Sequence, residues 1–237
     1  MDPTTEPTAK KPWSWVSLLV LIALVLVYVA LVRGPGAGTS GTAGPAIGRH
    51  LTYLRLEPLT GEATSVTLDD LSGRVTLVNY WGTWCPPCRR EFPELVAMQE
   101  KFAGRDDFRM YLVSCGEEGT DPDLAPLRTE TEQFLASKKF KVPSYADQNA
   151  ATRRALVLLL ADYLHGFAYP TTIVLDGGGA IRGFWQGYDQ RATSEMADLI
   201  EQLLTANQPA TESADSNPAA AAAGSTAAVT APLTATR

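Results

Sequence analysis

Apolar residues recur along the chain in patterns that predict a sheet of buried strands. The segments 75–80 and 108–114 are nearly continuous apolar runs of strand-forming residues, which is typical of strands buried on both faces. Two later runs bracket the Gly-rich turn at 176–179 and predict a β-hairpin. Two shorter strands are expected on either side of a turn at Thr60 and Gly61. The predicted strands are 51–56, 66–68, 75–80, 108–114, 172–175 and 181–185.

Helical periodicity lies between and after these strands. From Cys88 to Phe102 the apolar residues recur on one face of a helix, and Phe92 and Leu95 belong to that stripe. Strands that alternate with helices favour a parallel core, and the hairpin adds an antiparallel edge. The pattern therefore predicts an α/β domain with a central mixed sheet flanked by helices. The predicted helices are 88–102, 131–139, 150–163 and 193–204.

Composition divides the chain into five segments. A short tail (1–12) precedes an uncharged apolar run at 13–32, a Gly-rich linker at 33–46, a globular domain at 47–205 and an Ala/Thr/Pro-rich tail at 206–237. A helix of about 20 apolar residues spans roughly 30 Å, the thickness of the hydrocarbon core of a bilayer. We therefore expect residues 13–32 to be a transmembrane anchor. A cleaved signal peptide is the alternative, although its apolar core is usually shorter.

The charge of the chain argues against nucleic-acid binding, and the apolar run bears on where the domain lies. The net charge is −6 and the isoelectric point is about 5.0, so the chain has no basic face for nucleic acid. Basic residues flank both ends of the apolar run and do not decide its orientation. The short N-terminal tail favours placing the domain on the periplasmic, extracytoplasmic side of the inner membrane.

Two cysteines carry the candidate chemistry. Cys85 and Cys88 form a C-x-x-C motif between a predicted strand and a predicted helix. A cysteine at a helix N-terminus is favoured as the thiolate, so Cys85 is expected to be the exposed nucleophile and Cys88 the resolving thiol. Such chemistry suits an oxidising compartment. A zinc or copper site would need further Cys or His ligands at matching spacing, which the sequence does not offer.

The run LVNYWGTWCPPCRREFPEL at 77–95 resembles the active-site stretch of the thioredoxin superfamily, and most closely its ResA/TlpA-type branch. Members of that branch are membrane-anchored or exported thiol-disulfide reductases with one thioredoxin-like domain. The resemblance covers residues 47–204 and implies a thioredoxin-like fold. It also implies that Cys85 and Cys88 are the redox pair.

The resemblance assigns three further site residues. Trp84 matches a tryptophan that shields the disulfide, Glu91 matches an acidic residue beside the redox site, and Pro170 matches a proline that is cis in this superfamily. Glu91 also lies one helical turn after Cys88, where a carboxylate can raise a cysteine pKa and move protons. The alternative role for Glu91 is a solvated charge on the surface of the helix. Thioredoxin carries a buried Asp where this chain has Asn79, which cannot titrate.

The resemblance implies a reductase of disulfides in exported proteins, with apocytochrome c as a substrate class and a DsbD/CcdA-type membrane protein as electron donor. No cofactor is expected. A disulfide oxidase or isomerase of the same fold and a metal-binding chaperone are the alternatives. Cys115 ends the predicted strand at 108–114 and is expected to be buried.

Overall fold

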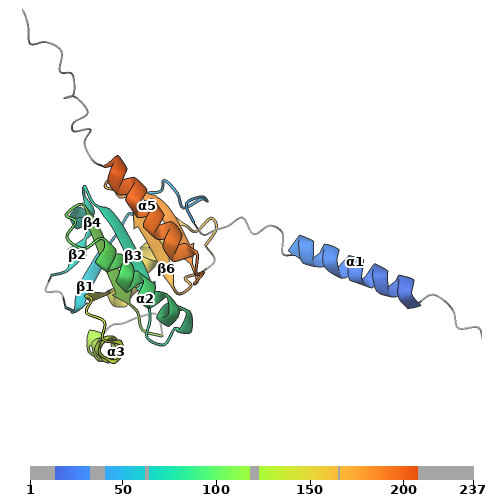
Figure 1. Ribbon diagram of the computed structural model, residues 1–237, viewed down its shortest axis with the longest axis horizontal. Coiled ribbons are helices and arrows are strands. Elements are labelled where there is room, and N and C mark those ends of the chain that lie inside the picture. Colours follow the sequence, from blue (N-terminus) through green and yellow to red (C-terminus); the bar gives the residue numbers. More distant parts are fainter. Residues whose placement is uncertain (1–13, 33–40, 62–63, 118–122, 165, 208–237) are drawn as a thin grey trace, which may run out of the picture. The chain divides into compact units, whose positions relative to one another are not determined.

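The computed structural model describes residues 14–32, 41–61, 64–117, 123–164 and 166–207 (Figure 1). The folded domain lies within residues 41–207. The predicted tail at 1–12 and residues 208–237 lie outside the described residues. Residues 41–46, which the sequence assigned to the linker, contact the domain instead: Gly41 pairs with Phe184, and Ala46 is 2% exposed.

A seven-stranded mixed sheet forms the centre of the domain, in the order β2-β1-β5-β4-β3-β6-β7. The pairs β3·β4 and β4·β5 are parallel and the other neighbours are antiparallel. This arrangement confirms the predicted mixed sheet and its antiparallel hairpin edge. The strands are β1 (Arg55–Thr60), β2 (Val66–Thr67), β3 (Val75–Trp81), β4 (Phe108–Ser114), β5 (Ser144–Ala146), β6 (Thr171–Leu175) and β7 (Ile181–Gln186).

Helices cover both faces of this sheet. Side chains of β3 alternate between the faces, so Leu77 and Trp81 enter one core cluster and Val78 and Tyr80 the other. The first cluster lies beneath α2 and α5, which Figure 1 shows over the same face; the second packs against α4. The helices are α1 (Ser14–Val32), α2 (Pro86–Lys101), α3 (Leu124–Lys138), α4 (Ala151–Leu159) and α5 (Ala192–Ala206), with 3₁₀ turns η1 (Leu68–Leu71) and η2 (Gln148–Ala150).

Several predicted boundaries were wrong. The strand placed at 51–56 is β1 at Arg55–Thr60, where it pairs with β2 and β5. Pro58 obscured it, because proline disfavours a strand interior; the register between β1 and β5 shifts next to Pro58. The three-residue strand β5 was missed. The predicted helix at 131–139 begins earlier, as α3, and the one at 150–163 ends earlier, as α4.

The helix α1 occupies Ser14–Val32, within the segment predicted as a membrane anchor. Trp13, the first residue of that segment, lies outside the described residues. In the part of the chain that the structure describes, no helix meets the combined length and hydropathy needed to cross a membrane.

Candidate functional site

The two motif cysteines form a disulfide at the start of α2. Their Cα atoms are 5.3 Å apart. Cys85 is the N-cap residue, and its sulfur accepts a hydrogen bond from the backbone N–H of Cys88 at 3.2 Å. Pro86 and Pro87 occupy the first positions of the helix, which need no backbone donor. The predicted placement of Cys85 at the helix N-terminus is therefore confirmed.

This geometry prepares Cys85 for nucleophilic chemistry. When the disulfide is reduced, a Cys85 thiolate would lie beside an N–H group that already points at its sulfur. The positive end of the helix dipole favours the same anion. Cys88 lies within the first turn of the helix, close enough to close the disulfide again. The pair can therefore take up or release two electrons by thiol-disulfide exchange.

The prediction that Cys85 is exposed was wrong for the disulfide form. Cys85 is 3% exposed and Cys88 1% exposed. Both sulfurs belong to the core cluster between the sheet and α2, and the rings of Trp84 and Tyr169 pack against that cluster. The motif alone could not predict that the disulfide is covered, because Tyr169 comes from a loop 81 residues after Cys88.

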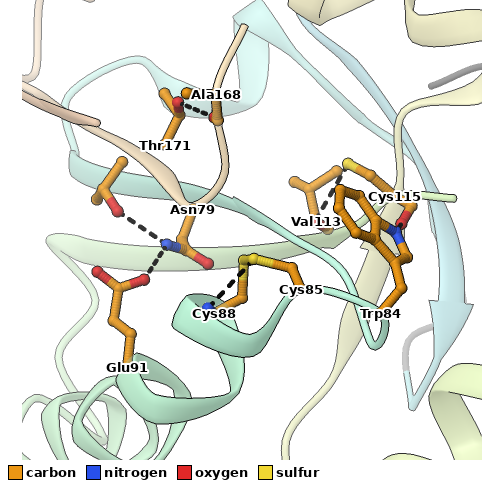
Figure 2. Close-up of a disulfide and its surroundings, with 10 residues drawn as sticks. Asn79, Trp84, Cys85, Cys88, Glu91, Val113, Cys115, Ala168 and Thr171 are labelled. Carbon is orange, nitrogen blue, oxygen red and sulfur yellow. Dashed lines mark hydrogen bonds between the residues drawn. A yellow bond between two sulfur atoms is a disulfide. The ribbon is translucent and has the colours of Figure 1, made fainter. Parts of the chain in front are cut away.

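Two contacts hold the ring of Trp84 beside the disulfide (Figure 2). Its indole N–H donates to the carbonyl oxygen of Cys115 at 2.9 Å, and its ring meets Tyr169 edge-on with centroids 5.2 Å apart. Gly82 makes room for it, since a Cβ there would lie 2.5 Å from the indole nitrogen. Cys115 lies outside the disulfide and is fully buried, as expected. Figure 2 shows Trp84 and Cys115 together on one side of the disulfide.

Glu91 is a buried carboxyl group, so its alternative as a solvated helix charge was wrong. Only 1% of Glu91 is exposed. The side-chain amide of Asn79 donates to its Oε2 at 3.0 Å and to the hydroxyl of Thr172 at 2.8 Å. Figure 2 shows Glu91 and Asn79 on the side of the disulfide opposite Trp84.

The surroundings of the Glu91 carboxyl group bring its pKa close to neutral pH. Burial raises its pKa to about 7, the hydrogen bond from Asn79 opposes this shift, and the nearby Glu94 adds to it. Sequence reasoning identified Asn79 only as a residue that cannot titrate. The missed signal was an amide side chain inside an apolar strand, which needs a buried polar partner.

Pro170 lies in the loop that leads into β6, and the Tyr169–Pro170 peptide bond is cis, as the resemblance implied. The carbonyl of Pro170 accepts a hydrogen bond from the N–H of Gly187 at 2.8 Å. Two positions later, Thr172 binds the amide of Asn79. This loop is therefore joined to the same strand that holds Glu91 in place.

A buried charged pair behind this loop was not predicted. Arg153 of α4 is 3% exposed and Asp147 is fully buried. The guanidinium Nε lies 3.0 Å from Oδ2 of Asp147, and Nη1 donates to the hydroxyl of Tyr169. Burial alone would lower the pKa of Arg153, but Cys115, Tyr169 and Asp147 together raise it. The pair connects α4 to the residue that precedes the cis proline.

In the described segments of the chain, no group of three or more His, Cys, Asp or Glu side chains is placed to hold a metal ion. Two reactive groups lie in the N-terminal half of α2, the disulfide and the carboxyl of Glu91, and Figure 2 shows them on the same side of β3 as Asn79. A disulfide of this kind can exchange with thiols, and a carboxyl group whose pKa lies near 7 can accept or donate a proton near neutral pH.

Known proteins resemble this chain in sequence and in fold. Residues 47–184 match the AhpC/TSA family. The chain is 34% identical to the thiol-disulfide oxidoreductase ResA of Halalkalibacterium halodurans, over 81% of this chain and 96% of that protein. It is 39% identical to the thiol:disulfide interchange protein DsbE of Pseudomonas aeruginosa, but over 35% of this chain and 47% of that protein, about half its length.

A secreted thiol-disulfide isomerase from Corynebacterium glutamicum has the same fold. Its crystal structure matches with a TM-score of 0.55 and 22% identity, over 73% of this chain and 96% of that chain. The family match spans more than half of the sequence, and the ResA relative is covered almost throughout. This chain therefore belongs to the AhpC/TSA family and is a thiol-disulfide oxidoreductase of the ResA type.

Proposed function

We propose that this protein reduces disulfides in exported proteins through Cys85 and Cys88. The observation that carries the proposal is the Cys85 sulfur at the N-terminus of α2, which already accepts a hydrogen bond from the backbone N–H of Cys88. A buried carboxyl group, that of Glu91, follows Cys88 by about one turn of the same helix. The ResA relative, with which most of the chain aligns, is a thiol-disulfide oxidoreductase and supports the exchange chemistry. The direction of electron flow is what the resemblance of residues 77–95 to ResA/TlpA-type reductases implies.

The reaction balances as an exchange of two electrons. The Cys85 thiolate attacks one sulfur of the substrate disulfide, forming a mixed disulfide and releasing the other substrate sulfur as a thiolate. The Cys88 thiolate then attacks the Cys85 sulfur and releases the second substrate thiolate. Both substrate sulfurs end as thiols, and the protein is left with the Cys85–Cys88 disulfide seen here.

Glu91 supplies the proton acceptor for the second step. Cys88 must lose its proton before it can attack, and a carboxylate with a pKa of about 7 is suited to accept a proton near neutral pH. Trp84 and Pro170 position the substrate: Trp84 lies on one side of the disulfide (Figure 2), and Pro170 lies in the loop that leads into β6.

The proposal includes the setting of the reaction. Residues 13–32 anchor the chain in the inner membrane, with the domain on the extracytoplasmic side, and the uncharged sequence of that segment is the support. A DsbD/CcdA-type membrane protein restores the dithiol by supplying two electrons. Apocytochrome c is a substrate class, as the resemblance to ResA/TlpA-type proteins implies.

The reduction potential of the Cys85–Cys88 couple tests the direction of flow. A reductase should have a reduction potential of about −220 mV or below, whereas the potential of a strong oxidant is about −120 mV. Equilibration with glutathione measures this potential. The expected result is a potential at the low end together with reduction of insulin, and Cys85→Ser should abolish that activity. A potential near that of the strong oxidant would refute the reductase proposal in favour of a disulfide oxidase.

A further inference from the structure

A groove of about 410 Å³ opens beside α4, on a part of the domain that the dithiol mechanism leaves unused. Apolar side chains form most of its lining, and two arginines contribute to it. Its lining includes Arg153, Arg154, Val157, Leu158, Phe167 and Tyr169.

Tyr169 belongs both to this groove and to the redox site. Its side chain lines the groove, while its ring meets Trp84 edge-on with centroids 5.2 Å apart. Its peptide bond to Pro170 is the cis bond that leads into β6. A molecule held in the groove therefore contacts Tyr169, whose ring packs against Trp84 beside the disulfide.

The groove wall is held by buried contacts rather than by solvated side chains. The hydroxyl of Tyr169 accepts a hydrogen bond from Arg153, which is paired with the buried Asp147. The ring of Phe167 lies between those of Tyr169 and Tyr80, with centroids 5.3 Å from each. A site whose wall is fixed in this way loses little conformational entropy when a ligand binds.

Two features of the groove indicate the chemistry of its ligand. Leu158 lines the groove and is 76% exposed, so its apolar surface is open to a ligand there. Arg154 is exposed on the same helix and forms no ion pair with any other described residue. Apolar surface next to an unpaired positive charge is complementary to a large apolar side chain next to a carboxylate.

We propose that the groove is a docking subsite for the substrate polypeptide, which places a large apolar residue against Leu158 and an adjacent Asp or Glu against Arg154. The inference rests on the proposed function, because it names the substrate segment that this dithiol site selects. A substrate disulfide must come within bonding distance of Cys85, so the chain that carries it passes Tyr169. Small disulfides without neighbouring side chains do not use the groove.

Synthetic peptides test the proposal with the full-length protein. Each peptide is closed by one disulfide and is flanked on both sides by Leu-Glu, Leu-Lys or Ser-Ser. We expect KM for the Leu-Glu peptide to be about tenfold lower than for the Ser-Ser peptide, the lower end expected for burying one leucine. The two values of kcat should agree, because the groove binds ground state and transition state alike.

Variants at exposed positions assign the effect to the groove. Leu158→Asp should remove the tenfold preference, and Arg154→Glu should exchange the order of the Leu-Glu and Leu-Lys peptides. Tyr53→Asp is the matched control, since Tyr53 is 40% exposed and does not line the groove. This control should keep the preference of the unchanged protein.

Three outcomes would overturn the proposal. Equal KM values for all peptides in the unchanged protein would show that the groove selects nothing. Unaltered preferences in Leu158→Asp would place the selection elsewhere. Loss of a dimer in Leu158→Asp without any change in KM would show that a second copy of the chain covers the groove.

Glutathione disulfide separates this proposal from the one on which it rests. It carries no leucine to place against Leu158, so Leu158→Asp and Arg154→Glu should reduce it at a rate close to that of the unchanged protein. If the unchanged protein reduces glutathione disulfide but treats the peptides alike, the groove proposal fails and the reductase proposal stands. If it reduces neither, the reductase proposal itself fails.

Discussion

Replacement of Glu91 by Gln should stabilise the oxidised protein at alkaline pH. The buried carboxyl has a pKa raised from 4.5 to about 7, so it binds more protons in the folded state than in the unfolded state between these values. For such a group, stability is highest below about pH 4.5 and falls as pH rises to about 7. Glutamine retains an oxygen that accepts from Asn79 and removes the charge.

The magnitude follows from the size of the shift. Each pKa unit corresponds to about 1.4 kcal/mol, so the shift at Glu91 costs the folded state about 3 kcal/mol above pH 7. Glu91 is 1% exposed, so solvent screens little of this cost. We expect Glu91→Gln to match the unchanged protein near pH 4 and to exceed its free energy of unfolding by as much as about 3 kcal/mol at pH 8.

Urea denaturation of the oxidised protein measures this difference at a series of pH values. The disulfide form is used because Cys85 and Cys88 then do not titrate. Glu100→Gln on the same helix is the control, since Glu100 is exposed and should leave the pH dependence unchanged. A constant difference between Glu91→Gln and the unchanged protein from pH 4 to pH 8 would refute the assignment of a raised pKa.

Three further substitutions have outcomes set by the geometry. Asn79→Ala removes a hydrogen bond that lowers the pKa of Glu91, so the fall in stability with pH should extend above pH 7; a shift to lower pH would contradict this. Gly82→Ala places a Cβ 2.5 Å from an indole nitrogen and should cost about 1–3 kcal/mol in urea melts and slow insulin reduction; unchanged values would show that the indole moves freely. Arg153→Met leaves Asp147 buried without its partner and should cost about 3–5 kcal/mol in the same melts, whereas a neutral effect would mean that the pair is dispensable.

The sequence predicted the elements whose signals are local. The strands β3 and β4 are continuous apolar runs buried on both faces, so their limits were placed within one residue. The helix α2 was predicted from Cys88 and begins two residues earlier, because Pro86 and Pro87 fit a first helical turn; the expected position of Cys85 at its N-terminus is confirmed. The family resemblance identified Glu91 and Pro170, and a shared helix face supported Glu91 independently.

Long-range contacts were not predictable in the same way. The strand β5 has three residues and owes its form to pairing with β1 and β4, which lie far away in sequence. Asp147, Arg153 and Tyr169 read as unrelated polar residues until the fold brings them together. The cover over Cys85 was missed for the same reason, because Tyr169 reaches it from a distant loop.

Trapping of mixed disulfides tests most directly whether Cys85 is the nucleophile of a disulfide reductase. Cys88→Ser removes the resolving thiol, so reaction with a protein disulfide should stop at a covalent complex through Cys85. The complexes should be resolved on a non-reducing gel and disappear on addition of dithiothreitol. We expect Cys88→Ser to trap exported proteins and Cys85→Ser to trap none. Complexes formed by Cys85→Ser and absent from Cys88→Ser would contradict the assignment of Cys85.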